Sequence, residues 1–433
     1  MESLQANTPQ EPGLQLGARP LRSGLWLHRD FRRLWAGQTI SQLGSTITRE
    51  ALPYTAILTL QATPLQMGLL GAAGAAPLLL LGLLAGVWVD RLRRRPIMIA
   101  ADLGRALLLL SVPLAYLLGR LGIAQLYVVA ALTGVLTVCF NVAYQAFLPT
   151  LIDREQLVEG NSKLGMSDSV AEIAGPPIGG ALVQLISGPV TVLLDAASFL
   201  VSASSLARIR AVEPPPDRHE QRPEVRRDLA TGLRAIWADP LLRPMAISST
   251  IRSFFGWFFG AIYGLYAIRV LGMGPALLGL TVACGGIGSF FGAALVGRIT
   301  RRFGAGPTTV GALLAGSLVS WMIWLAGSFP LAVVPLMVAS QILHDMGHTI
   351  ATINQVSLRQ TITPDRLLGR VNASMQVLGE GIGALGLLAG GLLAEAIGLR
   401  STVAVALLGG MLGSLWLACS PLRRLRELPE PAE

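Results

Sequence analysis

The chain has 433 residues, of which 52% are hydrophobic and only 14% are charged. Soluble domains carry about 25% charged residues, so this composition excludes an ordinary soluble protein and indicates a polytopic membrane protein. The net charge of +9 would suit a nucleic-acid partner. The arginines, however, cluster between apolar segments, where membrane topology and anionic headgroups account for them. We therefore expect membrane lipids, and no nucleic acid, as partners.

The N-terminal region, residues 1–30, precedes the first apolar segment. Residues 1–17 are polar and lack the apolar core of a signal peptide, so this end is expected to stay in the cytoplasm. The residues that follow mix Leu, Trp and Phe with arginines, which is typical of an interfacial lead-in. The three cysteines of the chain are widely separated and predict neither a disulfide framework nor a zinc site.

Twelve apolar segments follow, each long enough to cross a hydrocarbon core about 30 Å thick as a helix. They cover residues 34–60, 65–89, 97–118, 122–148, 162–186, 189–209, 243–268, 275–297, 306–327, 330–357, 371–397 and 400–420. When the connections are assigned alternately to two sides, most of the 34 Lys and Arg residues fall on one side, and the other holds only Arg120, Arg269 and Arg400. The positive-inside rule then predicts twelve transmembrane helices with both termini cytoplasmic.

The longest polar break, residues 211–240, divides these segments into six and six. It contains three consecutive prolines, which cannot continue a helix, and then an amphipathic stretch that predicts a surface helix. The predicted organisation is a cytoplasmic tail and lead-in at 1–30, a six-helix bundle at 31–210, a cytoplasmic linker with an amphipathic helix at 211–240, a second six-helix bundle at 241–420 and a cytoplasmic tail at 421–433.

The two halves are repeats of each other. A shift of 211 residues places Gly175 on Gly386 and the pair Gly179–Gly180 on Gly390–Gly391. The basic loop after the second segment recurs after the eighth, at a shift of 207 residues. Two parallel, pseudo-symmetric six-helix bundles with a site between them at mid-membrane form a recognised transporter architecture.

Two motifs carry a resemblance to a known family. The second and third segments are joined through Gly86-x-x-x-Asp90-Arg91-x-x-Arg94-Arg95, and the fifth contains Gly175-Pro176-Pro177-Ile-Gly179-Gly180. The first resembles the signature loop of the major facilitator superfamily, although Arg93 replaces the usual glycine of the turn. The second resembles the antiporter motif of its exporter branches. Residues 360–374 and 194–199 are similar to the secretion-effector branch, which is similar to the enterobactin exporter and macrolide efflux pumps.

The resemblance implies a monomeric secondary transporter in the bacterial cytoplasmic (inner) membrane. It would export an amphipathic small molecule, such as a drug, macrolide or siderophore, by alternating access, with protons as the coupling ion and no cofactor. The alternative is an importer or a proton-independent uniporter. The fourth segment lacks the intramembrane arginine of many proton-driven drug exporters, and Gly297 stands where the second loop would repeat Asp90.

Each motif has a physical interpretation. In the gating loop, Gly86 permits close helix approach, while Asp90 and Arg91 are expected to latch the cytoplasmic side. The arginines of the loop, Arg94 and Arg95 among them, could pair with carboxylates or headgroups; the alternative, favoured for Arg93 and Arg95, is that they act only as topology determinants. The antiporter-like motif combines small residues with two prolines, which favours close packing and a bent helix that seals the outer half.

Charged residues inside the segments are candidates for coupling or substrate binding, because an unpaired intramembrane charge costs several kcal/mol. They are Arg49, Glu50, Asp168, Glu172, Asp195, Arg252 and Glu380. Asp168 and Glu172 are four residues apart and share a helical face, so they could carry a proton or bind a cationic substrate. The alternative for these acids is a structural ion pair with Arg49 or Arg252.

The tenth segment contains His344-Asp345-Met346-Gly347-His348, in which His344, Asp345 and His348 form a candidate proton relay or substrate contact. The pattern resembles H-E-x-x-H, so a membrane metallohydrolase is a remote alternative. No third ligand is evident and no ATP-binding G-x-x-x-x-G-K-[ST] motif occurs. We therefore predict no metal, no enzyme activity and no direct use of ATP. The aromatic seventh segment, near Trp257, could line a cavity or face lipid.

Overall fold

The computed structural model describes residues 24–89, 92–211, 213 and 225–426, without the side chains of residues 79, 82–89 and 225–226. Every regular element in these ranges is a helix. Each of the twelve predicted segments coincides with a helical span, which confirms the predicted fold class. Nine spans within the described ranges are long and apolar enough to cross a membrane.

The first half contains six long helices among its described residues. They are α1 (Arg29–Tyr54), α2 (Pro64–Val89), α3 (Arg94–Leu117), α4 (Ile123–Leu151), α5 (Leu157–Ile186) and α6 (Gly188–Ala207). The short helices η1 (Leu25–Leu27) and η3 (Arg154–Gln156) precede α1 and α5. Between the halves lies α7 (Val225–Ala238), in the region where the sequence predicts an amphipathic surface helix.

The second half repeats this order. Its uninterrupted spans are α8 (Leu242–Leu265), α9 (Pro275–Phe303), α12 (Val333–Ile362) and α15 (Leu399–Ala418). The ninth span is divided into α10 (Ala305–Val319) and α11 (Trp321–Ala326), and the eleventh into α13 (Asp365–Glu380) and α14 (Gly383–Ile397). The short η5 (Pro330–Ala332) precedes α12, and η6 (Pro421–Arg424) follows α15.

The two divided spans differ from the prediction, which made each of them continuous. The ninth breaks at Ser320, whose hydroxyl bonds back to the Gly316 carbonyl oxygen at 2.9 Å. The eleventh breaks at Gly381, within a glycine-rich stretch of low helix propensity. A side chain at the nearby Gly383 would meet the Trp257 ring, so the backbone after the break packs closely against α8.

Backbone details repeat at the shift of 211 residues found in the sequence. α1 continues into a π-helical turn, η2 (Thr55–Thr59), and α8 continues into the equivalent turn, η4 (Tyr266–Val270). Gln61 and Ser187 have positive φ angles of 52° and 87°, and their equivalents are Gly272 and Gly398, with 68° and 85°. The halves therefore share one backbone plan. At these two positions only the second half has glycine, which adopts a positive φ without steric strain.

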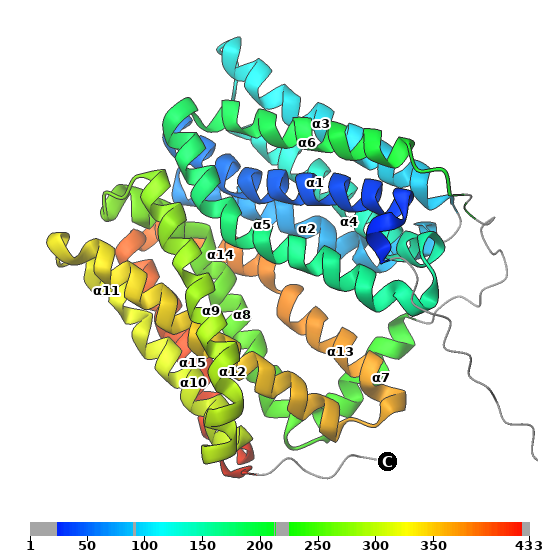
Figure 1. Ribbon diagram of the computed structural model, residues 1–433. Helices are drawn as coiled ribbons and strands as arrows, with labels where there is room; N and C mark the ends of the chain where they lie inside the picture. Colours follow the sequence, from blue (N-terminus) through cyan, green and yellow to red (C-terminus); the bar gives the residue numbers. More distant parts are fainter. Residues whose placement is uncertain (1–23, 90–91, 212, 214–224, 427–433) are drawn as a thin grey trace, which may run out of the picture.

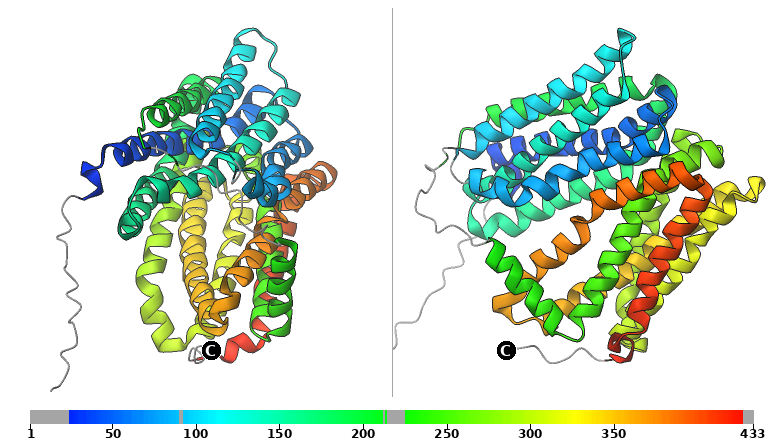
Figure 2. Two further views of the ribbon diagram at one scale, coloured as in Figure 1. Left: turned by 90° about the vertical axis from the view of Figure 1, so that its right-hand side faces the viewer. Right: turned by 180° about the vertical axis from the view of Figure 1, so that it is seen from behind.

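The two halves form two lobes that meet at one end (Figure 1). In the first lobe α1 packs against α5 and α6, and in the second α12 packs against α9 and α10. The main packing between the lobes joins α5 to α9 and α2 to α14, and we call the end where these pairs meet the closed end. At the other end of the second lobe, α7 packs along α13 (Figure 2).

A charged pair lies in the core of the first lobe. Arg105 forms a buried ion pair with Asp102, the structural pair that the spacing of three residues suggests. Its guanidinium also lies 4.5 Å from the ring centre of Phe140 and 4.1 Å from that of Phe199. Cation–π contacts and the ion pair together compensate for burying this charge.

Candidate functional site

A cavity of about 870 Å³ lies between the lobes. Among the described residues, the first lobe contributes to its wall the α1 residues Arg49, Glu50, Pro53 and Tyr54. The second lobe supplies the rest, mainly from α8 and α12. The size suits a drug-sized ligand, since such sites typically measure about 300–1,000 Å³.

Polar residues line the cavity along one face of α12. They are Gln341, Asp345, His348, Thr352, Gln355 and Arg359. Their spacing of three or four residues places them above one another on the helix. This polar face lowers the hydropathy of α12, which is not among the nine spans of the described residues that are long and apolar enough to cross a membrane.

The two histidines of the candidate relay both line the cavity. Nδ1 of His344 lies 2.9 Å from the Ser320 hydroxyl, and Nδ1 of His348 lies 3.2 Å from a guanidinium nitrogen of Arg252. The imidazole rings are nearly parallel, with centres 6.3 Å apart. Asp345 accepts a hydrogen bond from the Gln341 amide at 2.9 Å. Among the described residues no group of three potential metal ligands occurs, so the geometry gives a metallohydrolase site no support.

Aromatic side chains form another part of the cavity wall. Phe255, Trp257, Phe259 and Tyr263 of α8 line the cavity, and Tyr54 of α1 joins them. Other aromatic residues of the same segment, such as Phe258, are buried between helices instead. The aromatic seventh span therefore contributes both to the cavity and to packing, and the cavity has a surface for planar apolar groups.

The intramembrane charges separate into distinct groups. Arg49, Glu50 and Arg252 line the main cavity. Arg49 forms a two-pronged ion pair with Glu172 of α5, with N–O distances of 2.8 and 3.0 Å. Glu172 thus has the arginine partner that the structural ion-pair alternative requires. Asp168 lies exposed one turn away on α5.

The two remaining candidate charges lie elsewhere. Asp195 of α6 is 2% exposed and accepts a hydrogen bond from the Ser198 hydroxyl at 3.0 Å, inside the first lobe. Glu380, at the end of α13, lines a second cavity of about 380 Å³. Ser249, Ser253, Gln355 and Arg359 line both cavities, so the two spaces adjoin.

The antiporter-like motif packs α5 between α1 and α9. A side chain at Gly175 would meet Thr46 of α1, and one at Gly179 would meet the Ile47 carbonyl oxygen at 3.2 Å. On the other face, a side chain at Gly180 would meet the Pro275 carbonyl oxygen. A side chain at Gly279 of α9 would in turn meet the carbonyl oxygen of Pro176. Pro177 continues the motif inside α5.

The same packing recurs between α2 and α14. A side chain at Gly391 would meet the Pro64 carbonyl oxygen, and one at Gly68 would meet that of Leu387, each at 2.7 Å. Gly391 is the repeat equivalent of Gly180, and Gly68 is that of Gly279. Two equivalent glycine contacts, one between α5 and α9 and one between α2 and α14, therefore join the lobes at the closed end.

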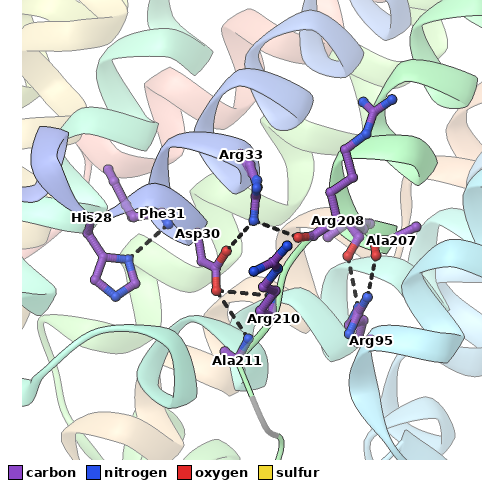
Figure 3. Close-up of polar contacts among 10 residues, drawn as sticks. His28, Asp30, Phe31, Arg33, Arg95, Ala207, Arg208, Arg210 and Ala211 are labelled. Carbon is purple, nitrogen blue, oxygen red and sulfur yellow. Dashed lines mark hydrogen bonds and ion pairs between the residues drawn. The ribbon is translucent and has the colours of Figure 1, made fainter.

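The predicted gating loop is only partly described. Gly86 lies in α2, whereas Asp90 and Arg91 lie outside the described residues, so the latch assigned to them stays a prediction. Arg95 donates to the Leu206 and Ala207 carbonyl oxygens, at 2.8 and 2.6 Å, at the end of α6 (Figure 3).

Further contacts of this region also stay within the first half and the linker. The backbone N–H of Arg94 donates to the Glu213 carboxylate at 2.6 Å. Asp30 accepts from the backbone N–H groups of Arg210 and Ala211 at 3.0 and 3.1 Å (Figure 3). The first helical turn of α3 and the end of α6 are thus both capped by side chains from neighbouring elements.

Sequence reasoning missed part of the cavity wall. It assigned Arg359 to a cytoplasmic connection, but the structure places this residue in the last turn of α12, facing both cavities. Thr352, Gln355 and Tyr54 were not singled out either. The polar spacing along residues 341–359 carried the signal, because a lipid-facing helix would not repeat polar residues every three or four positions.

Two repeated helical bundles around a cavity, in a chain with many apolar spans, define a multi-pass membrane transporter. The sequence model of the Major Facilitator Superfamily matches residues 34–386 and 245–432, and the chain belongs to this superfamily. The predicted family and its efflux branch are thus confirmed.

Known relatives and structures agree with this assignment. The chain is 30% identical to the multidrug efflux pump Tap of Mycolicibacterium fortuitum, over 89% of this chain and 93% of Tap. It is 26% identical to the enterobactin exporter EntS of Escherichia coli O1:K1 / APEC, over 93% and 94%. A bacterial homologue of the iron transporter ferroportin, solved in an inward-facing state, shares the fold with a TM-score of 0.71 at 17% identity, over 92% and 99% of the two chains.

Proposed function

We propose that this protein is a proton-coupled exporter of amphipathic small molecules that works by alternating access in the bacterial cytoplasmic membrane. The observation that carries the proposal is the cavity between the lobes, together with the paired glycine contacts that pack the lobes closely at the closed end. Tap and EntS are named as a multidrug efflux pump and an enterobactin exporter, which supports export over import.

The distribution of arginines orients the molecule in this proposal. The closed end holds the connections with few basic residues, while the opposite end carries the start of α1, the end of α15 and the helix ends that flank the arginine-rich connections. The positive-inside rule then places the closed end outside and residues 211–240 in the cytoplasm. In this proposal the cavity faces the cytoplasm and can load substrate from that side. The packing at Gly180 and Gly391 is what must separate for release.

Two cavity carboxylates are the proposed proton carriers. Glu50 of α1 and Asp345 of α12 both lie close to Tyr263. Neither forms an ion pair with an arginine among the described residues, in contrast to Glu172, which is held by Arg49. A carboxylate without a fixed counter-ion can gain and lose a proton during the cycle at lower cost than a paired one.

Inverted membrane vesicles test this function directly. An exporter should carry a fluorescent amphipathic probe into the lumen of energised vesicles, because the cytoplasmic face is then outside. We expect accumulation to stop when an uncoupler dissipates the proton gradient. Probe uptake by intact cells would instead favour the importer, and gradient-independent equilibration would favour the uniporter.

A further inference from the structure

The main cavity contains two arginines without a carboxylate partner in the part of the chain that the structure describes. Among the described residues, the hydrogen-bond partner of Arg252 of α8 is the imidazole of His348. Arg359 of α12 has a buried Nε atom that makes no hydrogen bond. The other arginines deep in the spans differ, since Arg49 is paired with Glu172 and Arg105 with Asp102.

An uncompensated guanidinium inside a membrane protein is costly, so its counter-ion is expected to come from what the cavity binds. The planar fork of arginine matches the geometry of a carboxylate or another oxyanion. The aromatic wall lies on the same helix as Arg252, since Phe255 and Trp257 follow Arg252 on α8 and also line the cavity. The site thus combines an anion-binding end with an apolar surface.

The charges in the cavity are also separated along its length. Asp345 and Arg359 are 14 residues apart on α12, which is about 21 Å along a helix. Glu50 and Asp345 lie near Tyr263, towards the closed end, whereas Arg359 lies in the last turn of α12 at the opposite end. An acidic group entering from that end would meet Arg359 first, at the junction with the second cavity that Glu380 lines, and would reach Arg252 beside His348 deeper in the main cavity.

We propose that the transported molecules are amphipathic organic anions, whose acidic group is held first by Arg359 and then by Arg252 deeper in the cavity, and whose planar apolar part lies against the α8 aromatic wall. This assignment rests on the proposed transport function and specifies its substrate class. The carboxylates near Tyr263 remain free to carry protons.

Two xanthene dyes of opposite charge test the assignment. Carboxyfluorescein and rhodamine 6G share a ring system, but the first is an anion and the second a cation. Purified full-length protein in lipid nanodiscs should bind carboxyfluorescein in preference, as measured by fluorescence anisotropy. Arg252→Gln and Arg359→Gln should each weaken this binding about tenfold or more, because a charge-assisted hydrogen-bond pair is lost.

Arg298→Gln is the matched control, because Arg298 is an exposed arginine on α9 that does not line either cavity. Size-exclusion profiles show whether each variant is folded. Preferential binding of rhodamine 6G, absence of carboxyfluorescein binding, or an affinity for carboxyfluorescein in the two cavity variants equal to that of the parent would overturn the anion assignment. Energised dye accumulation in vesicles, with either dye, reports separately on the proposed export function.

A different observation carries a second inference, at the closed end. The Gln184 side-chain oxygen of α5 accepts a hydrogen bond from the backbone N–H of Ala276, in the first turn of α9, at 3.2 Å. The Glu395 carboxylate of α14 accepts one from the backbone N–H of Leu65, in the first turn of α2, also at 3.2 Å. Both acceptors and both donors are 211 residues apart, the shift that relates the two halves.

Each lobe therefore caps a helix of the other. The first backbone N–H groups of a helix have no partner within it, and an acceptor there is favoured by the helix dipole. These two hydrogen bonds form only while the lobes are together and must break when the closed end opens. Arg269 adds a third crossing contact, from its guanidinium to the Ala62 carbonyl oxygen at 2.9 Å.

We infer that Gln184 and Glu395 are gate residues that hold the closed end shut. Gln184→Ala and Glu395→Ala should each shift the protein towards opening at this end by about threefold to tenfold, and the double variant further, since one net hydrogen bond is lost per site. Glu395→Gln should behave almost like the parent, because the equivalent site in the other half already carries glutamine.

Thiol labelling measures this shift. Cysteine is introduced at Gly256, which lines the cavity and has open space around its Cβ position, after serine replaces the three native cysteines. Labelling by a membrane-impermeant maleimide in right-side-out vesicles should be faster in both alanine variants. Glu155→Ala, an exposed acid in η3, is the control. Unchanged labelling rates in the alanine variants, or equal acceleration by Glu155→Ala, would overturn the gate assignment.

Discussion

Replacing Gly180 with leucine should reduce transport at least tenfold while both lobes remain folded. A side chain here would collide with the Pro275 carbonyl oxygen of α9, and backbone atoms cannot turn away as a side chain can. The collision lies between the lobes, so each lobe keeps its own packing and only the closed state is lost. Initial rates of energised dye uptake in inverted vesicles, normalised to the amount of protein, measure the effect.

Gly279→Leu should have the same consequence, because its side chain would meet the Pro176 carbonyl oxygen across the same contact. Gly165→Leu is the matched control in α5, since no atom lies within 4 Å of its Cβ position. Labelling at the cysteine introduced at position 256 should show permanent access from outside in both contact variants. Near-normal transport by the Gly180 variant would mean that the lobes need not meet closely in the cycle.

The helical spans could be predicted because each depends on local sequence. A helix that crosses the hydrocarbon core must be long and apolar, and arginine-rich connections identify one side of the membrane. The breaks at Ser320 and Gly381 could not be predicted in the same way. They depend on partners far along the chain, since Ser320 also bonds His344 of α12 and Gly383 lies against Trp257 of α8.

Some residues of the site could likewise be predicted from the sequence, and others depend on how the helices pack. Residue type alone identified Glu50, Arg252 and the His344–His348 group as candidates, and these do line the cavity. The pairing of Arg49 with Glu172 joins residues 123 positions apart and requires knowledge of how α1 packs on α5. Gln184 and Glu395 looked like ordinary polar residues at helix ends, although the repeat shift of 211 already related them to each other.

Glu50→Gln should abolish proton-driven accumulation, by at least tenfold, while substrate binding and exchange of substrate for substrate persist. Glu50 is the only carboxylate that the first lobe contributes to the main cavity within the described residues, and the hydroxyl of Tyr54 lies beside it. Glutamine keeps the size and hydrogen bonding of the side chain but cannot release a proton. The lobes can still alternate with substrate bound, so a counterflow assay should give near-normal rates while gradient-driven uptake in inverted vesicles fails.

Glu159→Gln provides the control, because this acid lies at the start of α5 and pairs with Lys163 away from the cavity. If Glu50→Gln still accumulates probe and Asp345→Asn does not, the coupling carboxylate is on α12 and the assignment to Glu50 is wrong.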